Sequence, residues 1–127
     1  MPDIKWLDSP EHHDYDAAEA YLRLILPRRE AENAASLLES DPEIVWVPAK
    51  DIVRAADLLG KVPPKSNEHV AKDLRKVEKG EALSPVLLVR GKRDKGVPLT
   101  IADGFHRVSA AYHVGENTLV PAKIVSA

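Results

Sequence analysis

One segment near the carboxyl end of the sequence constrains the fold most strongly. Residues 97–102 are typical of an apolar strand, and residues 105–114 have the apolar spacing of an amphipathic helix. Only Asp103 and Gly104 separate the two, so the chain must turn sharply from strand into helix. A helix start leaves backbone N–H groups unpaired and carries partial positive charge. The turn is therefore a candidate site for a phosphate or carboxylate group.

Composition limits the classes of protein that fit. The chain has 127 residues, 44% of them apolar, which indicates one folded domain of modest size. Its formal net charge of −2 gives no overall basic field of the kind that most DNA-binding modules show. Cysteine is absent, which excludes disulfides, thiolate metal sites and thiol catalysis.

The hydropathy pattern predicts no membrane association. No apolar run approaches the roughly 20 residues that span a bilayer. The first residues are too polar for the apolar core of a secretory signal. We therefore expect a cytoplasmic protein.

The first forty residues predict a helical hairpin. Asp14 or Asp16 can cap a first helix, and Pro27 separates it from a second helix over residues 28–39. The expected apolar positions recur at helical spacing; they are Ala17, Ala20, Tyr21, Leu24 and Ile25, then Ala31, Ala34, Ala35 and Leu38. We expect residues 1–41 to form this hairpin, packed on a main domain of residues 42–127.

The main domain has a mixed pattern. In order, we expect a strand (43–48), a helix (50–58), a helix capped by Asn67 and ended by Gly80, a strand (85–89), a polar turn (91–96), the strand and helix described above, and a last strand (119–125). The strands on either side of the polar turn can pair as a hairpin. This order predicts an α+β fold in which a small mixed β-sheet packs with helices.

Several of these segments together resemble a known family. The residues that carry the resemblance are Gly80-Glu81, Leu83 to Val89, Asp103 to Arg107 and Val120 to Ile124. They are similar to the ParB/sulfiredoxin superfamily, also called ParB-like nuclease domains, over about two thirds of the chain, leaving the amino-terminal hairpin outside. The resemblance implies a mixed-sheet fold in which a G-x-x-R turn before a helix grips the phosphates of a nucleotide.

The resemblance transfers roles to particular residues. Gly104, Phe105, His106 and Arg107 match the phosphate-gripping turn, and Asp103 matches the aspartate that precedes it in the free serine kinases of the superfamily. Sulfiredoxins have a catalytic cysteine in this turn, so a chain without cysteine is not a thiol-dependent sulfiredoxin. Partition proteins carry a second arginine and a downstream helix-turn-helix domain; neither is present here, and specific DNA binding is not expected.

The chemistry of these residue types agrees with an anion site. Arg107 offers a planar fork of donors to phosphate oxygens, His106 offers a donor that strengthens when protonated, and Gly104 allows close backbone approach. Asp103 has three possible roles: a helix cap, a ligand of Mg²⁺, or a catalytic base. Lys65 and Asn67 form a possible second phosphate-facing element; the alternative is a solvated loop in which Asn67 only caps a helix.

Two main functional hypotheses follow. The first is binding of a nucleotide, ATP or CTP with Mg²⁺, at the Asp103–Arg107 turn; a resulting enzyme would be a phosphotransferase or nucleotide hydrolase, with Asp103 and His106 catalytic. The second is a non-catalytic module whose hairpin docks a second copy of the chain or a partition or toxin partner. DNA-associated nuclease activity is a weaker alternative, because no cluster of carboxylates supplies a two-metal site.

Three other features have ordinary readings. We expect the segment from His12 to Asp16 to be a polar lead-in to the first helix, or to pack on the sheet domain, rather than to bind a metal, because neighbouring side chains on a helix point in different directions. The basic residues from Arg90 to Lys95 are typical of a solvated hairpin tip. We expect Trp6 and Trp46 to be core anchors or residues that dock a helix, and His69 to be a surface histidine.

Overall fold

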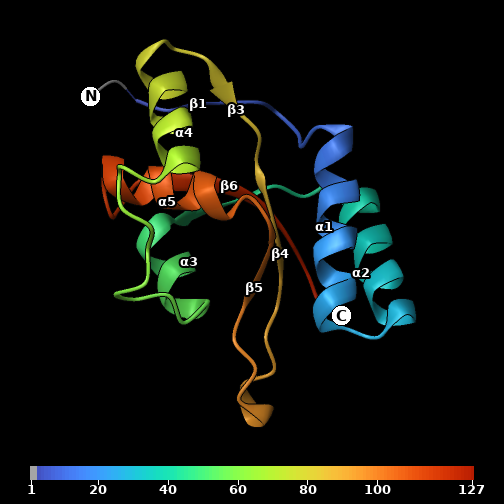
Figure 1. Ribbon diagram of the computed structural model, residues 1–127. Coiled ribbons are helices and arrows are strands. Elements are labelled where there is room, and N and C mark those ends of the chain that lie inside the picture. The colour runs from blue at the N-terminus through green and yellow to red at the C-terminus, as the bar shows by residue number, and fades with distance from the viewer. Residues whose placement is uncertain (1–2) are drawn as a thin grey trace.

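The structure is a computed structural model that describes residues 3–127, and its elements alternate between short strands and helices (Figure 1). In order they are β1 (Lys5–Trp6), α1 (His12–Ile25), α2 (Arg28–Ser40), β2 (Val45–Pro48), α3 (Ala49–Ala55), α4 (Glu68–Glu78), β3 (Ala82–Leu83), β4 (Val86–Val89), the short 3-10 helix η1 (Arg93–Lys95), β5 (Thr100–Asp103), α5 (Phe105–Val114) and β6 (Leu119–Val125). Within residues 3–127 no helix combines the length and the apolar character needed to cross a bilayer.

Four strands form a mixed sheet in the order β2-β6-β4-β5. β6 lies between an antiparallel neighbour, β2, and a parallel neighbour, β4. β4 and β5 form the predicted antiparallel hairpin. The α+β class with a small mixed sheet is therefore confirmed. Two further strands, β1 and β3, pair in parallel as a separate ribbon; each has only two residues, too few to show a period in the sequence.

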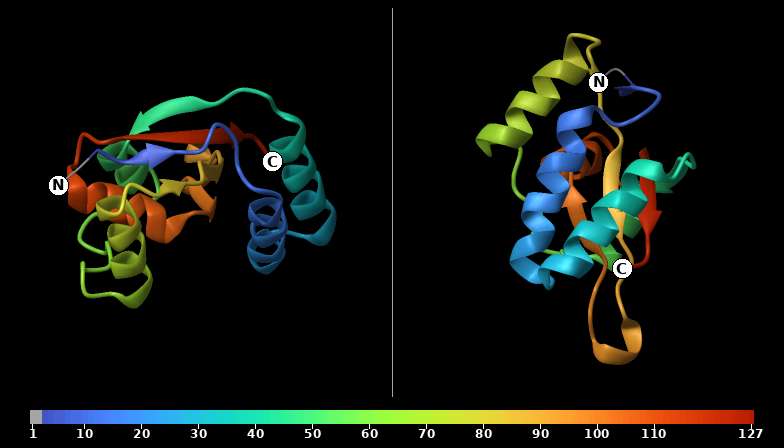
Figure 2. Two further views of the ribbon diagram at one scale, coloured as in Figure 1. Left: turned by 90° about the horizontal axis from the view of Figure 1, so that it is seen from above. Right: turned by 90° about the vertical axis from the view of Figure 1, so that its right-hand side faces the viewer.

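Helices cover both faces of the sheet, as the turned views show (Figure 2). Successive side chains of a strand point to opposite faces, and β4 follows this rule. Leu87 and Val89 pack in one hydrophobic cluster with the apolar faces of α1 and α2, while Val86 and Leu88 pack in another with α3 and α5. This alternation explains why β4 is apolar at every position: both of its faces are buried.

The hairpin of α1 and α2 is tied to the sheet by packing and by one buried cation. The α2 face predicted from the sequence is buried; it consists of Ala31, Ala34, Ala35 and Leu38. Lys123 of β6 is buried, and its Nζ donates to the carbonyl oxygen of Leu38 at 3.1 Å. The same ammonium lies 5.1 Å from the ring centroid of Tyr15 in α1. A cation at the carboxyl end of a helix also interacts favourably with the helix dipole.

The ends of two helices are set by particular residues. The carboxamide oxygen of Asn67 accepts hydrogen bonds from the backbone N–H groups of His69 (3.0 Å) and Val70 (3.2 Å), which confirms Asn67 as the cap of α4. The first long helix starts earlier than predicted, with Glu11 as its N-cap. Asp14 lies within the first turn of α1 rather than before it. Its carboxylate accepts a hydrogen bond from the backbone N–H of Glu11 at 2.8 Å and so stabilises the helix start.

Candidate functional site

The strand-to-helix turn has the sharp geometry that the sequence predicts. Gly104 is the N-cap residue of α5 and has a φ of +103°, in the left-handed region that favours glycine. A Cβ atom at this position would lie 2.5 Å from Val86 Cγ1, closer than real contacts allow. Glycine is therefore required here both by the backbone conformation and by the close approach of β4.

Asp103 does not cap α5, so that prediction is wrong. Its carboxylate oxygen Oδ2 accepts a hydrogen bond from Arg107 Nη2 at 2.9 Å instead. The arginine lies one helical turn further along and reaches back to the carboxylate. In the part of the chain that the structure describes, no side chain caps α5. The backbone N–H groups of the first turn therefore lack the partner that Asn67 gives to α4.

Arg107 joins three parts of the fold. Besides Asp103, its guanidinium contacts the Asp14 carboxylate of α1, with 3.8 Å between Nη1 and Oδ1, and donates to the carbonyl oxygen of Pro85 at 3.4 Å. The arginine side chain is only 17% exposed, and that of Asp14 only 2%. Its Nε is buried and has no hydrogen-bond partner among the described residues. The head group is thus turned inward and shared between two carboxylates.

A polar pocket of about 240 Å³ lies in front of this turn. Its lining residues come from the starts of α1 and α5, one side of α4, and the β3–β4 segment; they are Glu11, His13, His69, Lys72, Asp73, Lys76, Ala82, Leu83, Ser84 and the whole turn Asp103 to Arg107. Three cationic groups, Lys72, Lys76 and Arg107, face three carboxylates in this lining. Cationic and acidic side chains are therefore equal in number in this lining.

His106 and His69 both line the pocket, and their rings lie close together at a tilt of 32°. Their ring centroids are 4.6 Å apart, and the Phe105 ring centroid lies 5.2 Å from that of His106. Burial and the neighbouring His69 lower the pKa of His106, and the Asp73 carboxylate only partly opposes them. His106 is therefore mostly neutral near pH 7, and an anion in the pocket would favour its protonated form.

The carboxylates of the pocket are also perturbed. Burial raises the pKa of Asp103, although the Arg107 guanidinium beside it acts in the opposite direction, and the nearby Asp14 adds to the rise. Burial likewise raises the pKa of Asp73. Perturbed titratable groups gathered in one hollow are typical of functional sites, although structural ion pairs produce them too.

A second hollow adjoins the polar pocket and shares Asp103, Gly104, Phe105 and His106 with it. This hollow has a volume of about 670 Å³. Its other walls are largely apolar and come from α1, the end of α3 and the strand β5; they include Tyr21, Ile25, Leu58, Leu99 and Ile101. The start of α5 thus stands between a polar compartment and an apolar one.

The remaining sequence candidates fall elsewhere. Lys65 and Asn67 are outside the lining of the polar pocket, and Asn67 is engaged in capping α4. His13 lines the pocket, but across residues 3–127 no group of three or more metal-ligating side chains is suitably placed for an ion. The basic hairpin tip is exposed, as is His69. Trp46 is 54% exposed, so its assignment to the core is wrong.

Sequence reasoning missed three charged residues of α4 that line the pocket, Lys72, Asp73 and Lys76, and it did not predict the contact of Asp14 with Arg107. The first three had a signal, because positions 69, 72, 73 and 76 lie on one face of a helix and all carry polar side chains. Asp14 had none, since only the packing of α1 against β5 brings it to Arg107.

No protein-family model matches this chain, and neither a curated protein nor a solved structure matches it. The resemblance to the ParB/sulfiredoxin superfamily accordingly stays a prediction, carried by the Asp103–Arg107 turn and the order of elements around it.

Proposed function

We propose that this protein binds a phosphate-bearing ligand, a nucleotide such as ATP or CTP, at the start of α5. One observation carries the proposal: a helix start that no described side chain caps opens into a polar pocket walled by lysines of α4. Unpaired N–H groups at a helix start and nearby ammonium groups are the donors that phosphate oxygens need.

Each residue of the pocket would contribute differently to phosphate binding. The backbone at Gly104 and Phe105 would approach the phosphate, while Lys72 and Lys76 would supply positive charge from the opposite wall. His106 would take up a proton as the anion enters. Arg107 is already paired with Asp103, so phosphate would compete with that carboxylate for the guanidinium. The orphaned Nε of Arg107 offers a further donor if the head group moves.

The adjoining apolar hollow supports a nucleotide rather than free phosphate. It meets the polar pocket at Phe105 and His106, whose rings lie together. A ligand with a charged phosphate chain and a flat base can place one part in each compartment.

Phosphoryl transfer is the chemistry that these groups would serve. Asp103 would accept the proton of an acceptor hydroxyl once phosphate draws Arg107 away, while the hydroxyl oxygen bonds to the terminal phosphorus and the nucleoside diphosphate leaves; its raised pKa suits a base. Lys72, Lys76 and His106 would stabilise phosphate charge. Because no cluster of three protein ligands exists within residues 3–127, Mg²⁺ would be held by phosphate oxygens and water; Asp103 as its single protein ligand is the alternative to Asp103 as the base.

Isothermal titration with ATP, CTP and ADP in the presence of Mg²⁺ tests the proposal. We expect saturable heat that weakens at least tenfold when Lys72 and Lys76 are both changed to alanine. The pair Lys61→Ala and Lys79→Ala is the control, because it removes the same charge outside the pocket lining. Absence of heat for the wild type, or equal loss in both double variants, would contradict a specific site.

A second candidate is a protein-interaction module that uses the hairpin. Ala31, Ala34 and Ala35, small residues that would allow a partner helix to approach closely, are buried inside this chain. The other side of the hairpin favours the idea, since Leu24 is 82% exposed and Tyr21 and Ile25 are also exposed. Light scattering of the wild type and Leu24→Lys is the test: a monomer at all concentrations in both would argue against self-association.

A further inference from the structure

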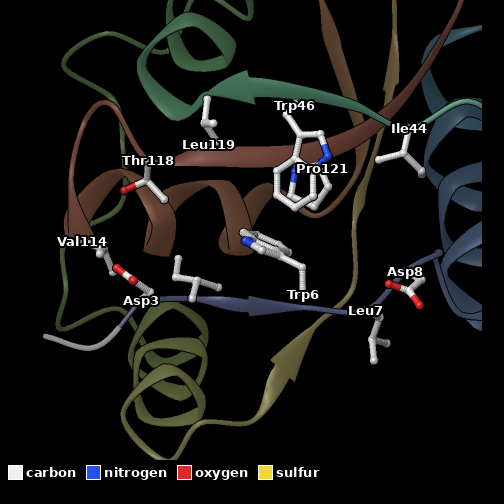
Figure 3. Close-up of a pocket in the computed structure, with 11 residues that line it drawn as sticks. Asp3, Trp6, Leu7, Asp8, Ile44, Trp46, Val114, Thr118, Leu119 and Pro121 are labelled. Carbon is white, nitrogen blue, oxygen red and sulfur yellow. The ribbon is translucent and has the colours of Figure 1, made fainter.

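An open groove lies between β1 and the strands β2 and β6 (Figure 3). Its volume is about 670 Å³, within the usual range for ligand pockets. The lining residues are Asp3, Ile4, Trp6, Leu7, Asp8, Ile44, Trp46, Val114, Thr118, Leu119 and Pro121.

Two tryptophans face each other across this groove. Trp6 rises from β1, and Trp46 descends from β2 beside Pro121, its partner in the β2–β6 register (Figure 3). Pro121 is buried and forms the floor, whereas Trp46 and Leu119 are 54% and 51% exposed. Large apolar side chains left exposed around a hollow commonly mark a binding surface.

The polar groups of the groove have a consistent character. Its charged lining residues, Asp3 and Asp8, are both acidic, both exposed, and located at opposite ends of the β1 segment. Within residues 3–127 the indole N–H groups of Trp6 and Trp46 make no hydrogen bond. The groove therefore offers flat apolar surfaces, free N–H donors and negative charge.

We propose that this groove binds an extended, proline-rich segment of a partner protein that carries lysine or arginine. Proline rings pack well on indole faces, and the polyproline II helix is already extended before it binds, so little entropy is lost. Its carbonyl oxygens point outward and can accept from the indole N–H groups, while proline has no N–H that would need a partner. The basic side chains would pair with Asp3 and Asp8.

The size of the groove separates this ligand from a smaller one. An aromatic cage for a methylated ammonium holds a single compact group, whereas this groove is open and large enough for several residues of peptide. It shares no lining residue with the polar pocket at α5. Failure of peptide binding would therefore leave the proposed nucleotide site untouched, and the reverse also holds.

Intrinsic fluorescence gives a direct test, because the chain has only two tryptophans and both line the groove. The probe is a short acetylated peptide in which prolines surround one lysine and one arginine. We expect a saturable blue shift with a dissociation constant on the order of 100 µM, typical of a weak peptide site. The same peptide with glutamates in place of the basic residues should bind at least tenfold more weakly.

Variants locate the site. Isothermal titration of Trp46→Ala should show at least tenfold weaker binding, and Asp8→Asn should show weaker binding that depends less on salt. Leu59→Ala, which removes an exposed apolar side chain away from the groove, is the matched control and should bind as the wild type does. Asp8 is exposed, so Asp8→Asn keeps the test valid even if Trp46→Ala unfolds.

Four results would overturn the proposal. They are no shift with the proline peptide, equal binding of the glutamate peptide, competition by tetramethylammonium at the same concentration as the peptide, and a shift that depends on protein concentration alone. The third result would indicate a small-cation site, and the fourth a second copy of this chain in the groove.

Discussion

A residue in the first turn of α4 and the first turn of α5 both line the polar pocket, but the two helix starts differ in their caps. Asn67 closes the start of α4, because its side chain accepts from two N–H groups of the first turn. At α5 the residue before the helix is Gly104, and the carboxylate next to it is held by Arg107. The two helix starts thus differ in whether a side chain satisfies their backbone N–H donors.

This difference shows how a fold can keep an anion site open. A free Asp103 carboxylate near the N-cap would neutralise the helix start. Arg107 holds that carboxylate to one side, and Asp14 shares the guanidinium, so both carboxylates have a partner other than the α5 N–H groups. The contrast between a closed start and an open one leads to four predictions.

The largest effect is expected for Arg107→Met. It leaves the nearly buried Asp14 and the partly buried Asp103 without their shared cation, which should lower the free energy of unfolding by about 3 kcal/mol. Chemical denaturation measures it. Arg54→Met, which removes an exposed arginine paired only with Asp51, is the control and should change stability little. Equal effects of the two would mean that the inward network contributes nothing.

The next effect concerns the turn itself. Gly104→Ala forces an alanine into a positive φ and against Val86, so we expect a loss of about 2 kcal/mol. Thermal unfolding gives the value. Gly60 also has a positive φ but has open space around its Cβ position, so Gly60→Ala should cost less. A Gly60→Ala loss as large as that of Gly104→Ala would show that contact with β4 is unimportant.

A smaller effect is expected at the closed helix start. Asn67→Ala removes the cap of α4 and should cost about 1 kcal/mol. If the two starts differ as described, inorganic phosphate should stabilise the wild type and Asn67→Ala by the same increment in melting temperature. Complete loss of phosphate protection in Asn67→Ala would instead assign the anion to α4.

The smallest effect is a dependence on pH. The pKa of His106 is lower in the folded protein than in the unfolded chain, because the folded structure disfavours the protonated ring. Below about pH 6.5 the unfolded chain therefore binds more protons at this position than the folded protein does. Wild-type stability relative to His106→Gln should fall as the pH drops from about 6.5 through the lower folded pKa. His12→Gln, at an exposed position in α1, is the control. A stability difference independent of pH between 7.5 and 5 would contradict the lowered pKa.

Local patterns were enough for much of the fold. The α2 face built on Ala31, Ala34 and Leu38, the Asn67 cap and the β4–β5 hairpin all follow from spacing and turn chemistry within a few residues. The sharp turn at Gly104 was predictable for the same reason. The two-residue strands β1 and β3 were not, because they exist only through pairing with each other.

The sequence by itself determined which kinds of groups occur at the α5 turn: an aspartate, then a glycine, a histidine and an arginine along the chain. Only the tertiary structure decided their partners. It brought Asp14 to Arg107, turned Asp103 away from the helix start, placed Lys72 and Lys76 across the pocket, and left Trp46 exposed opposite Trp6. The physical reason is that a polar or aromatic side chain has several acceptable partners nearby in sequence, and packing between distant segments selects among them.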